Sequence, residues 1–299
     1  MSQRSRTVIA HRGASGYLPE HTLAAYAMAH AMGADFLEPD LVMTRDGVLI
    51  ARHDVILEDT TDVAAVFPAR RRADGHWYAV DLDLAEIRGL QARERTEHRF
   101  RRDSHGFPVP TFEELLQLVA ELNRLTGRRT GVYPETKQPG FHRAAGLPME
   151  EPLLALLESY GYHDAADPVF VQSFDPESLR HMRASLGTRL RLVQLVGDPA
   201  PVTPSGLDAI AAYADAIGPD RRLIDPYQAG DAPGPGLVRD AHARGLLVHP
   251  YTFRADAVDP RYPDFESELR RFCFELGVDG LFSDHPDRAA AVLHATPAR

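Results

Sequence analysis

The stretch that says most about the fold runs from residue 35 to residue 54 and reads DFLEPDLVMTRDGVLIARHD. Its first part, 35–40, is an apolar run with two acidic residues at its end, as expected for a buried strand. Two further apolar runs, 41–43 and 48–51, flank Asp46-Gly47, and Asp-Gly in this position is a strong hairpin signal. We therefore predict a strand and then a hairpin over 41–53, which returns His53 towards Glu38 and Asp40.

Similar strand-like runs recur along the chain, and amphipathic helical patterns separate them. There are eight such runs, at 7–10, 35–40, 131–135, 169–172, 191–196, 214–218, 246–249 and 280–283. Alternating strands and helices with short connections predict a parallel sheet, and eight repeats predict closure of that sheet. The fold class is thus expected to be α/β, a (β/α)8 TIM barrel.

The alternation stops over residues 55–110, which are rich in Arg, Asp and His. A segment this long without regular alternation is usually functional or forms an inserted subdomain. We predict that residues 1–299 form a single barrel domain and that 55–110 is a small cap inserted into it. Because the segment follows the hairpin, we expect it on the same face of the barrel as Glu38, Asp40 and His53.

Composition excludes several classes of protein. The chain has 299 residues, 44% of them hydrophobic, and a net charge of −10, which argues against a nucleic-acid partner. No apolar stretch approaches the roughly 20 residues that span a bilayer, and no signal-peptide core follows Met1. We expect a monomer or homodimer in the cytoplasm, or in the periplasm or outside the cell if a leader has been removed. Cys273, the only cysteine, cannot form an internal disulfide and is expected to be buried.

Three carboxylates fall at the ends of neighbouring predicted strands. Glu38 and Asp40 are two residues apart, so a strand would place both on one face, and Glu135 ends the next barrel strand. Like charges gathered in this way need a compensating cation. Three oxygen ligands suit Ca²⁺ or Mg²⁺ better than zinc, which prefers nitrogen and sulfur. The alternative is a set of salt bridges with Arg12 and Lys137.

Two histidines and two cations accompany these carboxylates. His11 and His53 each end a run that points to the same mouth, and imidazole suits proton transfer near neutral pH. Either histidine could instead be a hydrogen-bonded structural residue. Arg12 and Lys137 could clamp a phosphate together with a divalent ion. Glu20 could orient Arg12 or cap the helix that begins near residue 21.

Later strands would supply the far side of the mouth. Gln172 ends one of them, with Phe174 two residues further on, and Tyr251 follows another, so they could form a wall against a small polyol. Packing at the rim is the alternative for these three residues. Asp284, after the last strand, is interpreted as a helix N-terminal residue.

Taken together, these motifs resemble those of the glycerophosphodiester phosphodiesterases. Within that family they are similar to the bacterial calcium-dependent, periplasmic type. The similarity extends from Val8 to about Ala291 and rests on His11-Arg12-Gly13, Pro19-Glu20-His21-Thr22, Glu38-x-Asp40, Thr44-Arg45-Asp46-Gly47, His53-Asp54 and Glu135-x-Lys137. The resemblance implies that His11 and His53 are the acid/base pair. It also implies that Glu38, Asp40 and Glu135 bind the metal, calcium above all, and that residues 55–110 form the family's cap.

The activity that the resemblance implies is hydrolysis of small-molecule glycerophosphodiesters, such as glycerophosphocholine and glycerophosphoethanolamine, to sn-glycerol 3-phosphate and an alcohol. Arg12 and Lys137 would then bind the phosphate. One alternative is a lysophospholipase-D-like enzyme, which would need an apolar groove beside the mouth. The other is a catalytically inactive phosphodiester-binding protein, which the competent residue at every candidate catalytic position disfavours.

Overall fold

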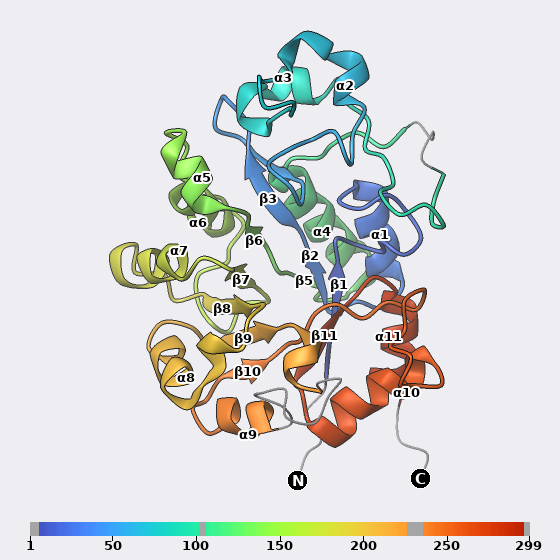
Figure 1. Ribbon diagram of the computed structural model, residues 1–299, viewed down its shortest axis with the longest axis vertical. Helices are drawn as coiled ribbons and strands as arrows, with labels where there is room; N and C mark the ends of the chain where they lie inside the picture. The colour runs from blue at the N-terminus through green and yellow to red at the C-terminus, as the bar shows by residue number, and fades with distance from the viewer. Residues whose placement is uncertain (1–5, 102–105, 226–235, 296–299) are drawn as a thin grey trace.

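The computed structural model describes residues 6–101, 106–225 and 236–295 of the chain. Parallel strands form a barrel, confirming the predicted (β/α)8 class (Figure 1). Its strands are β1 (Thr7–His11), β2 (Phe36–Glu38), β3 (Asp40–Met43), β5 (Gly131–Val132), β6 (Glu135–Thr136), β7 (Phe170–Ser173), β8 (Arg191–Val196), β9 (Ala216–Pro219), β10 (Leu247–Val248) and β11 (Gly280–Ser283). β11 pairs with β1, and hydrogen bonds from Asp279 N to Val248 O (3.0 Å) and Phe282 N to Pro250 O (3.1 Å) complete the ring.

Two barrel positions are each occupied by a pair of short strands, where the sequence predicts one continuous strand. Pro39 separates β2 from β3, and Pro134 separates β5 from β6. Proline has no N–H to donate to a strand ladder, so each ladder is interrupted there. The carbonyl of Pro39 still accepts a bond from Glu135 N at 2.8 Å, which keeps the two positions in register.

The predicted hairpin is present. β3 pairs antiparallel with β4 (Leu49–Ala51), and Leu41 lies opposite Ala51. Gly47 has φ of +79°, a conformation that favours glycine, and the Thr44 hydroxyl accepts a bond from Val48 N at 2.9 Å. The hairpin therefore leaves the mouth of the barrel and returns His53 to it.

Helices surround the barrel, and most of them bury one main hydrophobic core against it. They are α1 (Leu23–Ala31), α4 (Phe112–Thr126), α5 (Pro139–Ala144), α6 (Glu150–Ser159), α7 (Pro176–Arg180), α8 (Pro204–Ala211), α9 (Gly236–His242), α10 (Phe265–Arg270) and α11 (Pro286–Leu293). α7 and α10 each continue into a π-helical turn, at His181–Ser185 and Arg271–Leu276. Cys273 is buried as predicted, and no helix of the described part of the chain is long and apolar enough to cross a membrane.

The part of residues 55–110 that contains α2 (Val63–Val66) and α3 (Leu84–Ile87) lies at one end of the molecule, at the top of Figure 1. Within the described residues of this segment, the structure forms α2 (Val63–Val66), α3 (Leu84–Ile87) and 3₁₀ turns at Pro68–Arg70 and Ala79–Asp81. Its apolar side chains form a second core that includes Val42 and Ile50 of the hairpin. The segment is thus packed onto the hairpin, on the side of the mouth.

Below the mouth, the barrel interior is filled by a layer of aromatic rings. Tyr133 stacks on Phe170 at 4.8 Å between ring centroids and meets Phe282 edge-on at 5.1 Å. The Tyr133 hydroxyl is 2.8 Å from His249 Nδ1. This packed layer forms the floor under the residues at the strand ends.

Candidate active site

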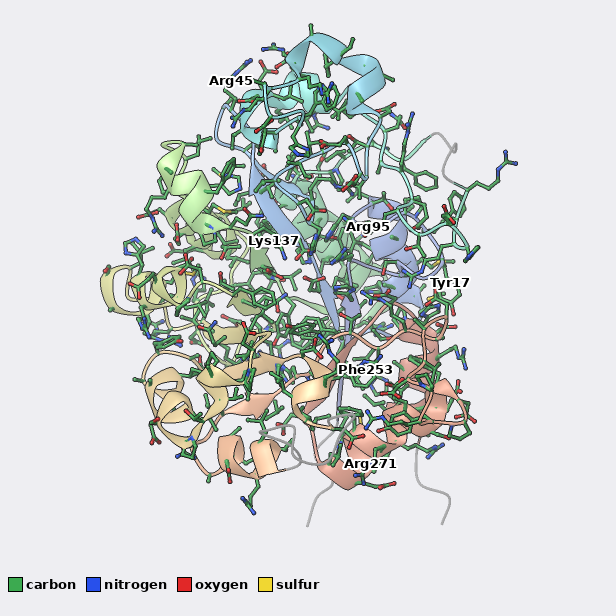
Figure 2. All side chains as sticks on the ribbon, viewed as in Figure 1. Tyr17, Arg45, Arg95, Lys137, Phe253 and Arg271 are labelled. Atoms are coloured by element: carbon green, nitrogen blue, oxygen red, sulfur yellow. The ribbon has the colours of Figure 1, made fainter. Side chains whose placement is uncertain are left out.

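The carboxyl ends of the barrel strands surround a cavity of about 430 Å³, here named the mouth cavity. The structure brings all of the predicted site residues into its lining: His11, Arg12, Glu38, Asp40, His53, Glu135, Lys137, Gln172, Phe174 and Tyr251. Figure 2 places Lys137 near the centre of the molecule, below α2 and α3. Strand-end positions in the sequence predict that these residues converge, and the structure places them around one cavity; their roles stay predictions.

The three carboxylates form a compact triad. Glu38 ends β2, Asp40 begins β3 and Glu135 begins β6, and Asp40 pairs with Glu135 in register. One oxygen from each lies within 4.8 Å of the others, and all three side chains are buried. We name Glu38, Asp40 and Glu135 the triad.

Burial and mutual repulsion dominate the electrostatics of the triad. Burial, with the Asp40 and Glu135 charges beside it, raises the pKa of Glu38 well above its usual range. Burial also raises the pKa of Glu135, to about 8, despite the nearby Lys137 ammonium. Burial acts in the same direction on Asp40, but Lys137, His53 and Arg12 outweigh it and hold the pKa of Asp40 well below its usual range. The triad could therefore hold a divalent cation, since its donors are all oxygens and their charges need compensation.

The two predicted phosphate-binding cations lie against the triad. Arg12 Nε is 3.2 Å from Asp40 Oδ2, and Arg12 N donates to Glu38 Oε2 at 2.8 Å. Lys137 Nζ is 2.8 Å from Glu135 Oε1 and 3.7 Å from Asp40 Oδ1. The salt bridges of the alternative interpretation are thus present. They do not exclude a metal, because Arg12 is shared with Glu20 and the three carboxyl groups of the triad outnumber the two cations.

Glu20 orients Arg12 and does not cap the helix. Its Oε2 accepts from Arg12 Nη1 at 2.9 Å, and its Oε1 accepts from Arg95 Nη2 at 2.8 Å. The cap of α1 is instead Thr22, whose hydroxyl accepts from Ala25 N at 3.2 Å. Of the two roles considered for Glu20, the structure supports the first.

The loop that carries Arg12 is tightly constrained. Arg12 and His21 both have positive φ, +60° and +58°, and His21 N donates to Arg12 O at 3.1 Å. Gly13 follows with φ of +84°, and a Cβ there would lie 2.8 Å from the Ala25 backbone. His21 Nε2 is 2.9 Å from Asp40 Oδ2, so the same loop also positions a triad carboxylate.

His11 is held by a carboxylate at the end of the last strand. Its Nδ1 lies 2.7 Å from Asp284 Oδ1, while Asp284 Oδ2 accepts from Arg99 Nη2 at 2.7 Å and Arg254 Nε at 2.8 Å. Burial, reinforced by the Arg12 charge, lowers the pKa of His11 to about 4. Near neutral pH the ring is therefore neutral, with the proton on Nδ1 facing the carboxylate and Nε2 unprotonated.

This arrangement corrects the interpretation of Asp284 as a helix N-terminal residue. The residue before α11 is His285, which makes no side-chain cap. Asp284 follows β11 directly, and its side chain is buried between His11 and two arginines. Its side chain holds the His11 imidazole, and no local sequence signal indicates this contact.

His53 has a similar set of partners on the other side of the mouth. Its Nδ1 lies 2.7 Å from Asp54 Oδ1, and Asp54 Oδ2 accepts from Arg95 Nη2 at 2.9 Å. Arg95 belongs to the 55–110 segment and lies near the centre of Figure 2. On each side, the histidine is thus bound to a carboxylate, which in turn is bound to an arginine. The His53-Asp54 motif gave a local signal for one of these residues, whereas Arg95 gave none.

The far wall of the mouth combines an amide with two aromatic rings. Gln172 Nε2 donates to Glu38 Oε1 at 3.0 Å, and its Oε1 is buried with no hydrogen-bond partner among the described residues. Phe174 is 45% exposed and meets Tyr251 edge-on at 5.8 Å. Because Phe174 is exposed to this extent, its ring is better placed to contact a ligand than to serve as packing at the rim.

Comparison with known proteins agrees with this geometry. The model of the glycerophosphoryl diester phosphodiesterase family matches residues 11–288. A glycerophosphodiester phosphodiesterase of Haemophilus influenzae is 33% identical, over 96% of this chain and 90% of its own length. One of Treponema pallidum is also 33% identical, over 98% and 93% of the two chains.

Solved structures show the same fold. The crystal structure of a glycerophosphoryl diester phosphodiesterase, described as putative, from Silicibacter pomeroyi matches with a TM-score of 0.72 at 28% identity, over 98% of this chain and 94% of that one. An Oleispira antarctica phosphodiesterase in complex with the product sn-glycerol-3-phosphate matches with a TM-score of 0.71 at 20% identity, over 97% and 98%. From the family match and the two relatives, the chain belongs to the glycerophosphoryl diester phosphodiesterase family of enzymes.

Proposed function

We propose that this protein hydrolyses glycerophosphodiesters to sn-glycerol 3-phosphate and an alcohol, with glycerophosphocholine and glycerophosphoethanolamine as representative substrates. The observation that carries the proposal is a carboxylate triad flanked, in one cavity, by two carboxylate-bound histidines and two cations. The names of the relatives agree with this activity, and the Oleispira antarctica structure contains the product that it would give.

Glu38, Asp40 and Glu135 would hold the cation, and we propose Ca²⁺, with Mg²⁺ as the alternative. A cation bound there would supply positive charge against the phosphate oxygens. Arg12 and Lys137 would contribute two further positive charges from the side of the substrate. The 55–110 segment would act as a cap, because it contributes Arg95 to the His53 side of the site.

His11 is proposed as the general base and His53 as the general acid. The low pKa of His11 leaves Nε2 free to accept a proton from the nucleophile near neutral pH. As the nucleophile bonds to phosphorus, the bond from phosphorus to the alcohol oxygen breaks and His53 protonates that oxygen. The nucleophile is either water or the neighbouring hydroxyl of the glycerol, and the second route would pass through a cyclic phosphate.

The test is release of sn-glycerol 3-phosphate by metal-stripped protein, measured for a panel of glycerophosphodiesters with Ca²⁺, Mg²⁺ or Mn²⁺ added back. We expect little release without metal and recovery with Ca²⁺. Unchanged release after chelation would contradict the metal role, and no release under any condition would contradict the function. Phosphorus NMR of the reaction would distinguish the two nucleophiles through a transient cyclic phosphate.

A second candidate, lysophospholipase-D-like activity, is favoured by one observation. An apolar groove of about 330 Å³ adjoins the mouth cavity and shares Phe174 and Leu195 with it, with Val196, Pro201 and Ile210 further along. A single acyl chain on the glycerol could lie in such a groove. Hydrolysis of lysophosphatidylcholine at a rate comparable to glycerophosphocholine would support this candidate, and no hydrolysis of the lipid would exclude it.

A further inference from the structure

A separate cavity of about 360 Å³ opens beside His53, and we name it the His53-side cavity. Its walls include His53, Asp54, Lys137, Phe141, Phe174 and Asp175. It shares His53, Glu135, Lys137 and Phe174 with the mouth cavity. One ester arm of a phosphodiester held at the triad would therefore extend into it.

The cavity on the opposite side, beside His11, has about the same size but a different charge. It measures about 400 Å³ and is lined by four guanidinium groups, those of Arg12, Arg95, Arg99 and Arg254, and by three carboxylates. Apart from Glu135 of the triad, the His53-side cavity is lined by two carboxylates, those of Asp54 and Asp175, and by the Lys137 ammonium. A cationic arm of the substrate is accordingly favoured on the His53 side and disfavoured on the His11 side.

Aromatic rings complete the His53-side cavity. Phe141 stacks on Tyr78 of the 55–110 segment, with ring centroids 5.6 Å apart and planes 24° apart, so its orientation is fixed. Phe174 is held edge-on by Tyr251. The face of an aromatic ring attracts ammonium groups, and two rings with a nearby carboxylate are a common way to bind a quaternary ammonium.

Asp175 is the carboxylate that the proposed mechanism does not use. It caps α7 by accepting from Glu177 N at 2.9 Å, which fixes its side chain. Asp54, by contrast, is already bound to His53 and Arg95. Asp175 therefore provides negative charge to this cavity without a role in proton transfer.

Among the described residues that line the cavity, Lys137 is the one Lys or Arg, and its charge is largely compensated. Its Nζ lies 5.7 Å from the Phe174 ring centroid but is bound to Glu135 at 2.8 Å on the triad side. In the active enzyme it would also face the phosphate. A cationic head group near Phe141 and Asp175 thus meets a site in which carboxylates outnumber free cationic charge.

We infer that the His53-side cavity is a subsite for a cationic leaving alcohol, an amino alcohol such as choline or ethanolamine, recognised by Phe141, Phe174 and Asp175. This inference rests on the proposed function and adds to it the chemical class of the preferred head group. It also places the departing alcohol beside His53.

The test compares glycerophosphocholine with its uncharged isostere, the glycerophosphodiester of 3,3-dimethylbutanol. The two esters differ only in that a carbon replaces the nitrogen, so shape and apolar contact are matched. We expect kcat/KM to favour the choline ester roughly tenfold in the wild-type protein. Asp175→Asn retains an oxygen for the helix cap but removes the charge, and should reduce this ratio about threefold. Phe141→Leu should reduce it by a similar factor.

Matched controls exist elsewhere in the chain. Asp264 caps α10 by accepting from Ser267 N at 2.7 Å, and it lines neither cavity. Phe274 is 43% exposed and has the Arg6 guanidinium 5.3 Å from its ring. Asp264→Asn and Phe274→Leu should leave the ratio at the wild-type value.

The outcomes are distinguishable. Hydrolysis of both esters at equal kcat/KM would overturn the subsite while leaving the proposed function intact. A wild-type preference that neither Asp175→Asn nor Phe141→Leu reduces would also overturn it, because the preference would then arise elsewhere. If the wild-type protein hydrolysed neither ester with any metal, the proposed function and the inference would fall together.

Discussion

On both sides of the mouth a histidine is bound to a carboxylate, and that carboxylate is bound to an arginine. The two sides are nevertheless built differently. On the His11 side the carboxylate, Asp284, follows the last barrel strand and its side chain is 2% exposed. On the His53 side the carboxylate, Asp54, lies next to its histidine in sequence and its side chain is 26% exposed. The first side depends on barrel closure and on Arg99 of the 55–110 segment, whereas the second depends on the hairpin and on Arg95 of the same segment.

This difference teaches how one fold can give two imidazoles different tasks. The buried side keeps its imidazole neutral and fixes its tautomer, which suits a base. The more exposed side adjoins a cavity suited to a leaving alcohol. The predictions below run from the largest expected effect to the smallest; those on activity each remove one element of this contrast, and one tests the barrel that supports both sides.

Removal of either imidazole should have the largest effect. His11→Ala and His53→Ala should each lower kcat for glycerophosphocholine by roughly 10²- to 10⁴-fold, because each removes a proton-transfer group. Steady-state assays with saturating Ca²⁺ would measure this. Near wild-type activity in both variants would refute the acid/base pair.

The supporting carboxylates should separate the two sides. Asp284→Asn should lower kcat on the order of 100-fold, because an amide cannot hold the Nδ1–H tautomer in the same way and leaves Arg99 and Arg254 without their shared charge. Asp54→Asn should cost only about tenfold, since its site is more open to water. Both variants need the thermal stability of the wild type for the comparison to hold. Equal losses would show that burial does not distinguish the sides.

Acid should weaken the barrel through its buried histidines. Burial lowers the pKa of His249 to about 4, and its Nδ1 lies by the Tyr133 hydroxyl. The unfolded chain takes up this proton near pH 6.5 and the folded chain only near pH 4, so the free energy of unfolding falls as pH drops through this interval. The loss from His249 at pH 5 should be about 2 kcal/mol. Denaturant titrations at pH 7.5 and 5 should show a smaller difference for His249→Gln; an identical difference would contradict the assignment.

Loss of Arg95 should have the smallest effect. Arg95→Met removes the bonds to Asp54 and Glu20, which are partly exposed to solvent at the arginine end. We expect kcat to fall about fivefold, with no change in the Asp284 contacts. Arg88→Met, which removes a surface ion pair of the same segment with Glu114, is the control and should be neutral. A fall of 100-fold or more for Arg95→Met would mean that the segment does more than support Asp54.

The sequence was sufficient wherever the signal is local. The eight strands, the hairpin around Asp46-Gly47 and the triad all follow from apolar runs and from the residues that end them. Pro39 and Pro134 could have indicated the two interruptions, since a missing N–H is visible in the sequence. The strand ends are predictable because closure of the barrel places them all around one mouth.

The rest of the site depends on contacts between distant residues. His11 and Asp284 are separated by 273 residues, and Arg99 and Asp284 by 185. Neither segment contains a sequence signal for its distant partner. The sequence alone therefore indicates only a helix end for Asp284. The second core of the 55–110 segment could not be predicted either, because Trp77, Phe67 and Phe141 pack against it only in the folded chain.

The contrast between the two sides is tested most directly with an activated substrate, the 4-nitrophenyl ester of glycerol 3-phosphate. Its leaving group departs as an anion and needs no proton. The kcat of His53→Ala should therefore approach the wild-type value on this ester, within about tenfold, while His11→Ala stays as impaired as on glycerophosphocholine. Rescue of His11→Ala in place of His53→Ala, or equal impairment of both on the two substrates, would contradict the assignment of base and acid to the two sides.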